Sequence, residues 1–149
     1  MTTGTIVALC VSDHKGTAKH AVQAVSLESG SGIVGDAHAG PGHRQLSALP
    51  AESIGRMRDK IPDLTDGAFG ENIVTDGIQW QTLPVGSQLR LGSSVRAEIT
   101  QHGKRCHTRC AIYYSAGECI MPSEGVFMRV LDDGDLRPGD PICLLSSPS

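Results

Sequence analysis

Short apolar runs, each ended by glycine, proline or polar residues, follow one another along the chain. Six segments have the apolar content or the alternation that is typical of β-strands: residues 4–11, 21–27, 69–74, 83–92, 95–101 and 141–145. In one of them, Val95, Ala97 and Ile99 share a face, as alternate residues of a strand do. A further apolar segment, residues 125–131, is compatible with either a strand or a helix.

Residues 51–60 are the best candidate for a helix. Pro50 stands where the first turn begins, a place that tolerates proline, and Pro62 follows the end. Ile54 and Met57, three residues apart, fall on the same helical face. Many short strands with one clear helix predict a mostly β fold: a closed or nearly closed β barrel with one or a few short helices.

The composition narrows this picture further. Aromatic residues make up only 3% of the 149, so the core must consist of aliphatic side chains, and neither a repeat nor a linker divides the chain. We therefore expect a single domain over residues 1–149. A formal charge of −3 gives nonspecific nucleic-acid binding no electrostatic support. No apolar stretch approaches the roughly 20 residues that span a bilayer, so we expect no membrane association through a spanning helix.

The five cysteines bear on the compartment and on the chemistry. The N-terminus lacks a basic region followed by a long apolar run, so we expect no signal peptide and a cytoplasmic protein. An odd number of cysteines in such a chain favours reduced thiols over a disulfide framework. Cys10 and Cys143 lie in predicted strands and are most simply core residues.

Two of the other cysteines lie in a strongly cationic segment, residues 101–110. Three cations and two histidines surround Cys106 and Cys110 there: Lys104, Arg105, Arg109, His102 and His107. Positive charge favours the thiolate, which is both the nucleophile and the metal ligand, so we expect a lowered pKa for Cys106 and the highest reactivity of the five. The alternative is a basic loop whose cysteines only pack.

Cys119 adds a third thiol close by in the sequence. With Cys106, His107 and Cys110 it would complete a soft four-ligand site of the kind that holds zinc. The spacing departs from that of a zinc ribbon, because three residues rather than two separate Cys106 from Cys110.

A glycine-rich loop at residues 35–44 is the second candidate site. Asp36, His38, His43 and Arg44 supply an acid, two imidazoles and a guanidinium, and the small residues between them permit close backbone approach to a ligand. An ordinary polar turn is the competing explanation. This loop would supply anion-binding groups and the segment 106–110 would supply thiols. Because one ligand could use both, we expect the loop and the segment to lie on the same rim of the barrel.

Two weaker candidates remain. Lys15 and Lys19 flank a Gly-Thr-Ala turn that would suit a phosphate, although solvated lysines explain the pattern equally and the spacing is not that of a P-loop. Glu71 and Asn72 stand between Gly70 and an apolar pair, where either side chain would cap a turn or face the site.

Seven short motifs, taken in order, resemble a stand-alone MOSC domain, a family named after the C-terminal domain of molybdenum cofactor sulfurase. They lie at residues 35–40, 43–45, 52–54, 69–73, 83–86, 103–107 and 125–130. The resemblance runs from about Ile6 to Leu144. It is strongest to the small bacterial and archaeal branch with a Cys-His…Cys-Ala-Ile…Cys-Ile-Met-Pro pattern.

The resemblance implies a β barrel that handles the molybdenum cofactor (molybdopterin). It also implies that a cysteine ligates molybdenum or carries sulfur for it. Cys106 matches the family's key cysteine by its place after Gln-x-Gly-Lys-x. Cys110 is its rival, because residues 109–112 resemble the Arg-Cys-Ile-Leu run of amidoxime-reducing members. Together with Cys119 these two form the expected metal-ligand set.

The cofactor is anionic, so the cations of both candidate sites become its expected partners. The expected cofactor-binding residues are Lys15, Lys19, Asp36, His38, His43, Arg44, Glu71, Asn72, Lys104, Arg105, His107 and Arg109. Related domains occur in enzymes that reduce amidoximes and N-hydroxylated compounds, but we expect no N-terminal extension of the kind those larger enzymes carry. Nor do we expect a desulfurase domain, so a partner such as a cysteine desulfurase would deliver sulfur.

Three functional hypotheses follow. The leading one is a domain that binds the pterin cofactor and carries or transfers sulfur through a cysteine, in contact with enzymes of cofactor biosynthesis or with acceptor enzymes. The second is a non-catalytic cofactor carrier or chaperone. The third is a small Cys/His zinc-binding module, which would contain zinc and no pterin.

Overall fold

The computed structural model describes residues 3–14, 18–103 and 124–148, and within these ranges seven strands close into a barrel. The barrel strands are β1 (Thr3–Val11), β5 (Leu46–Pro50), β6 (Ile73–Asp76), β7 (Gln88–Leu91), β8 (Val95–His102), β9 (Val126–Val130) and β11 (Pro141–Ser146). Their order around the barrel is β1, β11, β7, β8, β9, β5, β6 and back to β1. The predicted mostly β barrel is confirmed.

One neighbouring pair in this ring is parallel. β5 and β6 run in the same direction, whereas the other pairs in the barrel are antiparallel. A parallel pair needs a crossover connection, and the helix α1 (Ala51–Arg58) supplies it together with residues 59–72. The helix begins directly after Pro50, as predicted, and ends two residues before the predicted boundary.

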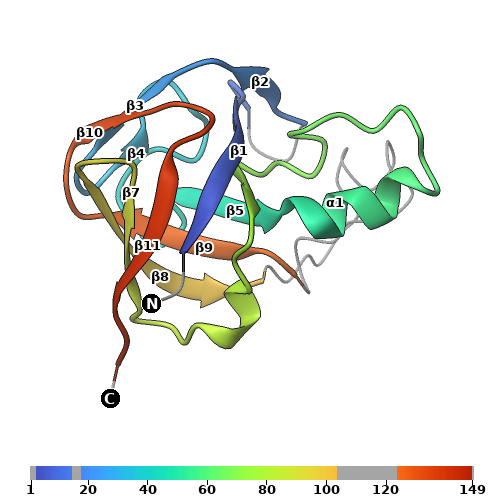
Figure 1. The fold of residues 1–149 in the computed structure, drawn as a ribbon. Helices are drawn as coiled ribbons and strands as arrows, with labels where there is room; N and C mark the ends of the chain where they lie inside the picture. Colours follow the sequence, from blue (N-terminus) through green and yellow to red (C-terminus); the bar gives the residue numbers. More distant parts are fainter. Residues whose placement is uncertain (1–2, 15–17, 104–123, 149) are drawn as a thin grey trace.

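Three more strands and a short helix complete the described fold. β2 (His20–Val22) extends the sheet beside β1, and a small second sheet has the order β10 (Gly134–Leu136), β3 (Val25–Glu28) and β4 (Gly32–Ile33). The 3-10 helix η1 (Trp80–Thr82) precedes β7. In Figure 1, α1 lies on one side of the barrel and the small sheet on the other.

Two apolar clusters hold this arrangement together. One fills the barrel with inward side chains such as Leu46, Ile99 and Met128. The other joins α1 to the outer face, where Ile54 and Met57 pack with Phe127 and with neighbours on β1, β5 and β6. Burying an aliphatic side chain of this size contributes about 1.5–3 kcal/mol, so α1 is fixed to the barrel mainly by this second cluster.

The strand boundaries differ from the predicted ones in a few places. The segment 21–27 forms two strands, because the exposed Gln23 and Ala24 separate β2 from β3. The segment 69–74 pairs only from Ile73 onward, and the ambiguous segment 125–131 is strand β9.

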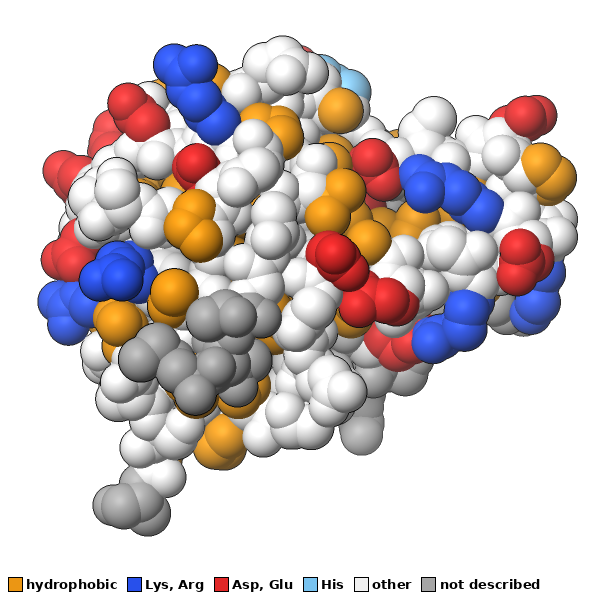
Figure 2. Space-filling model, in the orientation of Figure 1, with side chains coloured by type: hydrophobic (Ala, Val, Ile, Leu, Met, Phe, Trp, Pro, Cys, Tyr) orange, Lys and Arg blue, Asp and Glu red, His pale blue; other side chains and the backbone are white. Residues whose placement is uncertain are grey.

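The surface agrees with the small net charge. Figure 2 shows acidic and basic side chains interspersed over the face that it presents. In the part of the chain that the structure describes, no helix has the length and apolar character needed to cross a bilayer.

Candidate functional site

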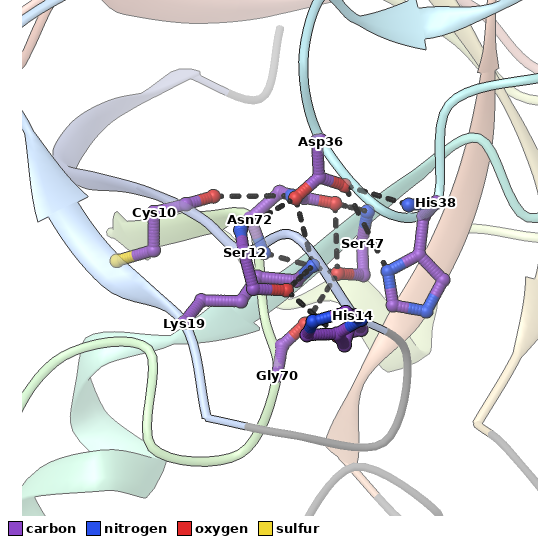
Figure 3. Close-up of polar contacts among 9 residues, drawn as sticks. All are labelled: Cys10, Ser12, His14, Lys19, Asp36, His38, Ser47, Gly70 and Asn72. Carbon is purple, nitrogen blue, oxygen red and sulfur yellow. Dashed lines mark hydrogen bonds and ion pairs between the residues drawn. The ribbon is translucent and has the colours of Figure 1, made fainter.

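A buried polar cluster of five residues connects β1, the loop after β4, β5 and β6. We refer to Ser12, Lys19, Asp36, Ser47 and Asn72 as the interior cluster (Figure 3). At its centre, Lys19 Nζ lies 2.8 Å from Asp36 Oδ1, and both side chains are fully buried. Lys19 also donates to Ser12 Oγ at 3.1 Å. The lysine is therefore not a solvated surface cation.

The carboxylate of Asp36 holds the start of the loop 35–44 in place. The Ser12 N–H donates to Oδ1 at 3.1 Å and the His38 N–H donates to Oδ2 at 3.0 Å. Burial alone would raise the pKa of Asp36. The hydrogen bond and the charge of Lys19 outweigh burial, with further hydrogen bonds from His38 and Asn72, so the pKa lies below its ordinary value. Asp36 is thus held as a carboxylate.

Ser47 and Asn72 form the other half of the interior cluster. Asn72 Oδ1 accepts hydrogen bonds from the Ser47 N–H at 3.0 Å and from Ser47 Oγ at 3.2 Å. Asn72 Nδ2 donates to the Cys10 carbonyl at 3.1 Å. One asparagine therefore ties β1 and β5 together at the start of β6. Buried amide groups require such partners, which explains why a polar residue stands here within apolar surroundings.

Glu71, next to Asn72 in the sequence, belongs to a different environment. Its two carboxylate oxygens accept the backbone N–H groups of Gly67, at 2.7 Å, and Phe69, at 3.1 Å. Burial raises the pKa of Glu71 to about 7, although these two hydrogen bonds oppose the shift. The side chain thus organises the loop before β6.

That loop packs closely on Lys19, the residue before β2, and on Cys10. Gly67 has a φ of 90° and leaves no room for a Cβ atom against the Lys19 carbonyl, while its own carbonyl accepts the Lys19 N–H at 2.7 Å. Burial, followed by the charges of Glu71 and Asp66, raises the pKa of Cys10 to about 12. Cys10 is fully buried, which confirms its place in the core, and it is held as a neutral thiol. The same expectation for Cys143 is wrong: it is only partly buried and belongs to neither apolar cluster, because Ile142 is the residue of that pair that faces inward.

A second polar group lies at the end of β8. We refer to His43, Arg44, Gln101 and Phe127 as the rim group. His43 Nε2 lies 2.9 Å from Gln101 Oε1, and Arg44 Nε donates to the same oxygen at 3.2 Å. The Arg44 guanidinium stands over the Phe127 ring, 5.3 Å from its centroid. His43 is exposed and Arg44 partly so, which leaves this group open to a ligand.

The rim group adjoins the point where the chain enters the cysteine-containing segment. Gln101 Nε2 donates to the Gly103 carbonyl at 2.8 Å, and the Gly103 N–H donates to the Gly125 carbonyl at 2.7 Å. Gly103 and Gly125 are thus neighbours in space.

The structure divides the predicted site residues into three sets. Lys19, Asp36 and Asn72 meet in the interior cluster, with the backbone of His38 attached, whereas His43 and Arg44 belong to the rim group and Glu71 to neither. The remaining candidates lie outside the described residues: Lys15, Lys104, Arg105, Cys106, His107, Arg109, Cys110 and Cys119. The expected common rim and the reactivity of Cys106 therefore stay predictions.

Sequence reasoning did not select Ser12, Ser47, Gln101 or Phe127. Each acts through a partner distant in the chain; Arg44 and Gln101, for example, are 57 positions apart. Gln101 did stand at the start of the recognised Gln-x-Gly-Lys motif. In the described ranges, no group of three or more His, Cys, Asp or Glu side chains is placed to hold a metal ion.

Two surface pockets lie apart from the rim group. One, of about 520 Å³, is lined by residues that include Lys19, His20, Arg58 and Asp66. The other, of about 410 Å³, lies between the start of α1 and η1, with Trp80 in its wall. Neither includes a residue of the rim group, so the rim group is a separate candidate.

Comparisons with known proteins agree with the architecture. The YuaD protein from Bacillus subtilis has a structure with a TM-score of 0.76 to this chain, at 19% identity and with 94% of each chain covered. YiiM from Geobacillus stearothermophilus gives a TM-score of 0.71 at 20% identity, covering 96% of this chain and 75% of its own. At such low identity these likenesses show a shared fold.

Sequence comparison extends the relationship. A protein named "Reductase" from Gibberella moniliformis is 31% identical over 132 residues, which cover 80% of this chain and 24% of the relative. The uncharacterized protein YflK from Bacillus subtilis is 27% identical over 115 residues, covering 73% of this chain and 51% of YflK. The chain thus spans about a quarter and about half the length of these two curated relatives. A family model for the MOSC domain matches residues 35–143. That match includes the rim group and most of the barrel, and the chain belongs to the MOSC domain family.

Proposed function

We propose that this chain handles the molybdenum cofactor: it binds the anionic pterin cofactor and accepts or passes on sulfur through a cysteine. Cys106 is the leading candidate for that cysteine and Cys110 its rival. The observation that carries the proposal is the position of Arg44 and His43. Both bond to Gln101, two residues before Gly103, where the cationic cysteine segment begins.

Chain length supports bringing the two candidate sites together. Cys106 follows Gly103 by three positions, so covalent geometry keeps their Cα atoms within about 11 Å of each other. Gly103 itself accepts a hydrogen bond from Gln101, which holds both His43 and Arg44. A ligand several ångströms across would therefore be within reach of the rim group and of the Cys106 thiol at once.

The donors of the rim group fit an anionic ligand. A guanidinium donates several hydrogen bonds to oxyanions, and the charge of Arg44 adds to the attraction. Arg44 would hold the phosphate of the cofactor, with His43 beside it, and the thiolates of Cys106 or Cys110, with Cys119, would ligate molybdenum. When bound, the cofactor would supply the metal centre, while the chain supplies thiolates and anion-binding groups.

The sulfur step needs no external oxidant. A thiolate of this chain attacks the terminal sulfur of a persulfide on a donor protein, and a new S–S bond forms as the donor's S–S bond breaks. The donor leaves as a thiolate, and this chain now carries the persulfide. Nearby cations favour the attacking thiolate, which is the reason for placing the step on Cys106 rather than on the neutral Cys10.

The experiment is transfer from a cysteine desulfurase supplied with isotopically labelled cysteine. Wild-type protein should gain one labelled sulfur on the peptide that contains Cys106, read by mass spectrometry without reductant. Cys106→Ser should lose the label. Cys143→Ser, at a partly buried position on β11, is the matched control and should keep it.

Other outcomes identify the alternatives. Loss of label in Cys110→Ser alone would move the role to Cys110. Protein that binds pterin but never acquires sulfur would be the carrier or chaperone. Stoichiometric zinc without pterin would contradict the proposal and favour the zinc-binding module.

A further inference from the structure

A β-bulge at Thr100 changes the direction of the Gln101 side chain. Ile99 pairs with Met128 and Gln101 pairs with Phe127, so β8 advances two residues where β9 advances one. Met128 packs in the barrel interior, whereas Phe127 packs in the outer cluster. With regular alternation Gln101 would share the inward face of Ile99. The bulge places it beside Phe127 instead, and bulges often re-aim a side chain in this way near functional sites.

Hydrogen-bond chemistry fixes the orientation of the Gln101 amide. Arg44 Nε carries a hydrogen and can only donate, so the group that faces it must be the amide oxygen. The opposite end of the amide faces the Gly103 carbonyl, which can only accept, so the NH2 group must point there. Turning the amide over would set donor against donor and acceptor against acceptor.

The fixed oxygen in turn selects the tautomer of His43. His43 Nε2 lies 2.9 Å from the same oxygen, and an oxygen that faces it requires a hydrogen on Nε2. Neutral His43 must therefore carry its proton on Nε2 and leave Nδ1 as an acceptor. Gln101 thus determines which nitrogen of the His43 imidazole carries the proton, as hydrogen-bonding neighbours of a histidine commonly do.

The same amide orients Arg44 without neutralising it. Arg44 Nε donates to Gln101, and Arg44 Cζ stands over the Phe127 ring. Among the described residues, none accepts a hydrogen bond from Arg44 Nη1 or Nη2. A guanidinium held at Nε and by an aromatic face presents its terminal nitrogens in a fixed plane, which suits an oxyanion.

We propose that Gln101 is a positioning residue: it orients the Arg44 guanidinium as the donor to an oxyanion of the phosphate class, and it sets the tautomer of His43 beside that site. The inference rests on the proposed function in one respect: the oxyanion would be the phosphate of the bound cofactor. The arrangement of the four side chains does not depend on any cysteine.

The test uses inorganic phosphate as the probe and the His43 side chain as the reporter. The ¹⁵N spectrum of the imidazole, assigned with His43→Asn, distinguishes the two tautomers at mildly alkaline pH. Wild-type protein should show the proton on Nε2, and phosphate should shift the His43 resonances. Gln101→Leu should give a mixture of tautomers and bind phosphate about tenfold more weakly, since lost orientation of a charged donor costs about one factor of ten.

Two further variants separate positioning from simple loss of structure. Gln101→Glu keeps an oxygen for His43 and Arg44, so it should retain the Nε2–H tautomer, while its negative charge beside Arg44 should weaken phosphate binding. Gln88→Leu is the matched control. Gln88 also accepts a hydrogen bond from an arginine, Arg96, on the barrel surface, and its loss should change neither readout.

Each result decides the proposal. An unchanged tautomer and unchanged phosphate affinity in Gln101→Leu would overturn the positioning role. Phosphate that leaves the wild-type His43 resonances unmoved would overturn the oxyanion site. If Gln101→Leu does not fold, Gln101→Glu decides alone, and loss of the tautomer there would contradict the inference. Because no cysteine takes part, these failures are distinguishable from a failure of sulfur transfer.

Discussion

The interior cluster and the rim group each contain one cation, yet the two cations have opposite surroundings. Lys19 is fully buried and bonds to the carboxylate of Asp36, so the charge of the pair is cancelled. Arg44 is partly exposed and bonds to the neutral amide of Gln101, so its charge remains. A cancelled charge cannot attract an anion over distance, whereas an uncancelled one can.

This difference separates a structural role from a binding role, and the sequence alone does not distinguish the two. The loop 35–44 carries residues of both groups: Asp36 at its start belongs to the interior cluster, and Arg44 at its end belongs to the rim group. The buried end is anchored by the Asp36 carboxylate, and the exposed end presents donors. We therefore expect changes in the interior cluster to affect stability and changes in the rim group to affect binding.

Removing the buried cation should have the largest effect. Lys19→Met leaves the Asp36 carboxylate buried without its counter-charge, and we expect the free energy of unfolding to fall by about 3–5 kcal/mol near neutral pH. Urea unfolding measures this loss. The control is Glu98→Gln, which removes a surface pair with Arg129 and should cost less than about 1 kcal/mol. Equal losses in both variants would remove the distinction between buried and surface pairs.

For the same variant we also predict how its loss of stability changes with pH. In the wild type the pKa of Asp36 is lowered, so its stabilising contribution is present above the unfolded pKa of about 4 and is lost as pH falls through the folded value. Without Lys19, burial dominates and the pKa of Asp36 rises, so acid lessens the penalty in the variant. The stability gap between the two proteins should narrow on acidification, and a widening gap would refute this account.

Glu71 should give the next largest effect, with the opposite dependence on pH. The pKa of Glu71 is raised from 4.5 to about 7 in the folded protein. Between these two pH values the unfolded chain therefore binds fewer protons than the folded protein does. Stability should therefore fall as pH rises through this window, by roughly 3 kcal/mol if the shift is fully expressed. In Glu71→Gln this part of the pH dependence should vanish. A variant whose stability profile runs parallel to that of the wild type would contradict the burial argument.

Replacing Arg44 should change stability least and binding most. Arg44→Met keeps an apolar stem over Phe127, so we expect a loss of stability of at most about 1 kcal/mol and phosphate binding weaker by about tenfold or more. Arg44→Lys keeps the charge but loses the planar guanidinium, so its phosphate affinity should lie between those of the wild type and Arg44→Met. Phosphate titration and urea unfolding of the same samples provide the comparison. A large loss of stability with unchanged phosphate affinity would assign Arg44 to the scaffold.

The barrel was predictable from sequence because its signals are local. Alternation in residues 95–99 and proline at the start of α1 each depend on neighbours within a few positions. The parallel pairing of β5 with β6 was not, because it depends on where the chain returns after α1. The residue types of the site were also predictable, since Asp36 and Arg44 stand out in a glycine-rich loop.

The partners within the site were beyond local patterns. Lys19 and Asp36 are 17 residues apart, and nothing in either neighbourhood indicates that the lysine is buried. The bulge at Thr100 is a sharper case. The alternation of Val95, Ala97 and Ile99 continues to Gln101, where an inward residue is expected and a polar one occurs. A polar residue at a position where the alternation predicts an apolar one was the sign in the sequence that the strand changes register.

The most direct test of the central claim is the molybdenum and pterin content of protein purified from a host that makes the cofactor. We predict that the wild type and Gln88→Leu contain molybdenum and pterin, and that the content of each is the same in the two proteins. Both should be reduced together in Arg44→Met and in Cys106→Ser, or in Cys110→Ser if that thiol is the ligand. Wild-type protein that contains neither molybdenum nor pterin after purification from such a host would contradict the account.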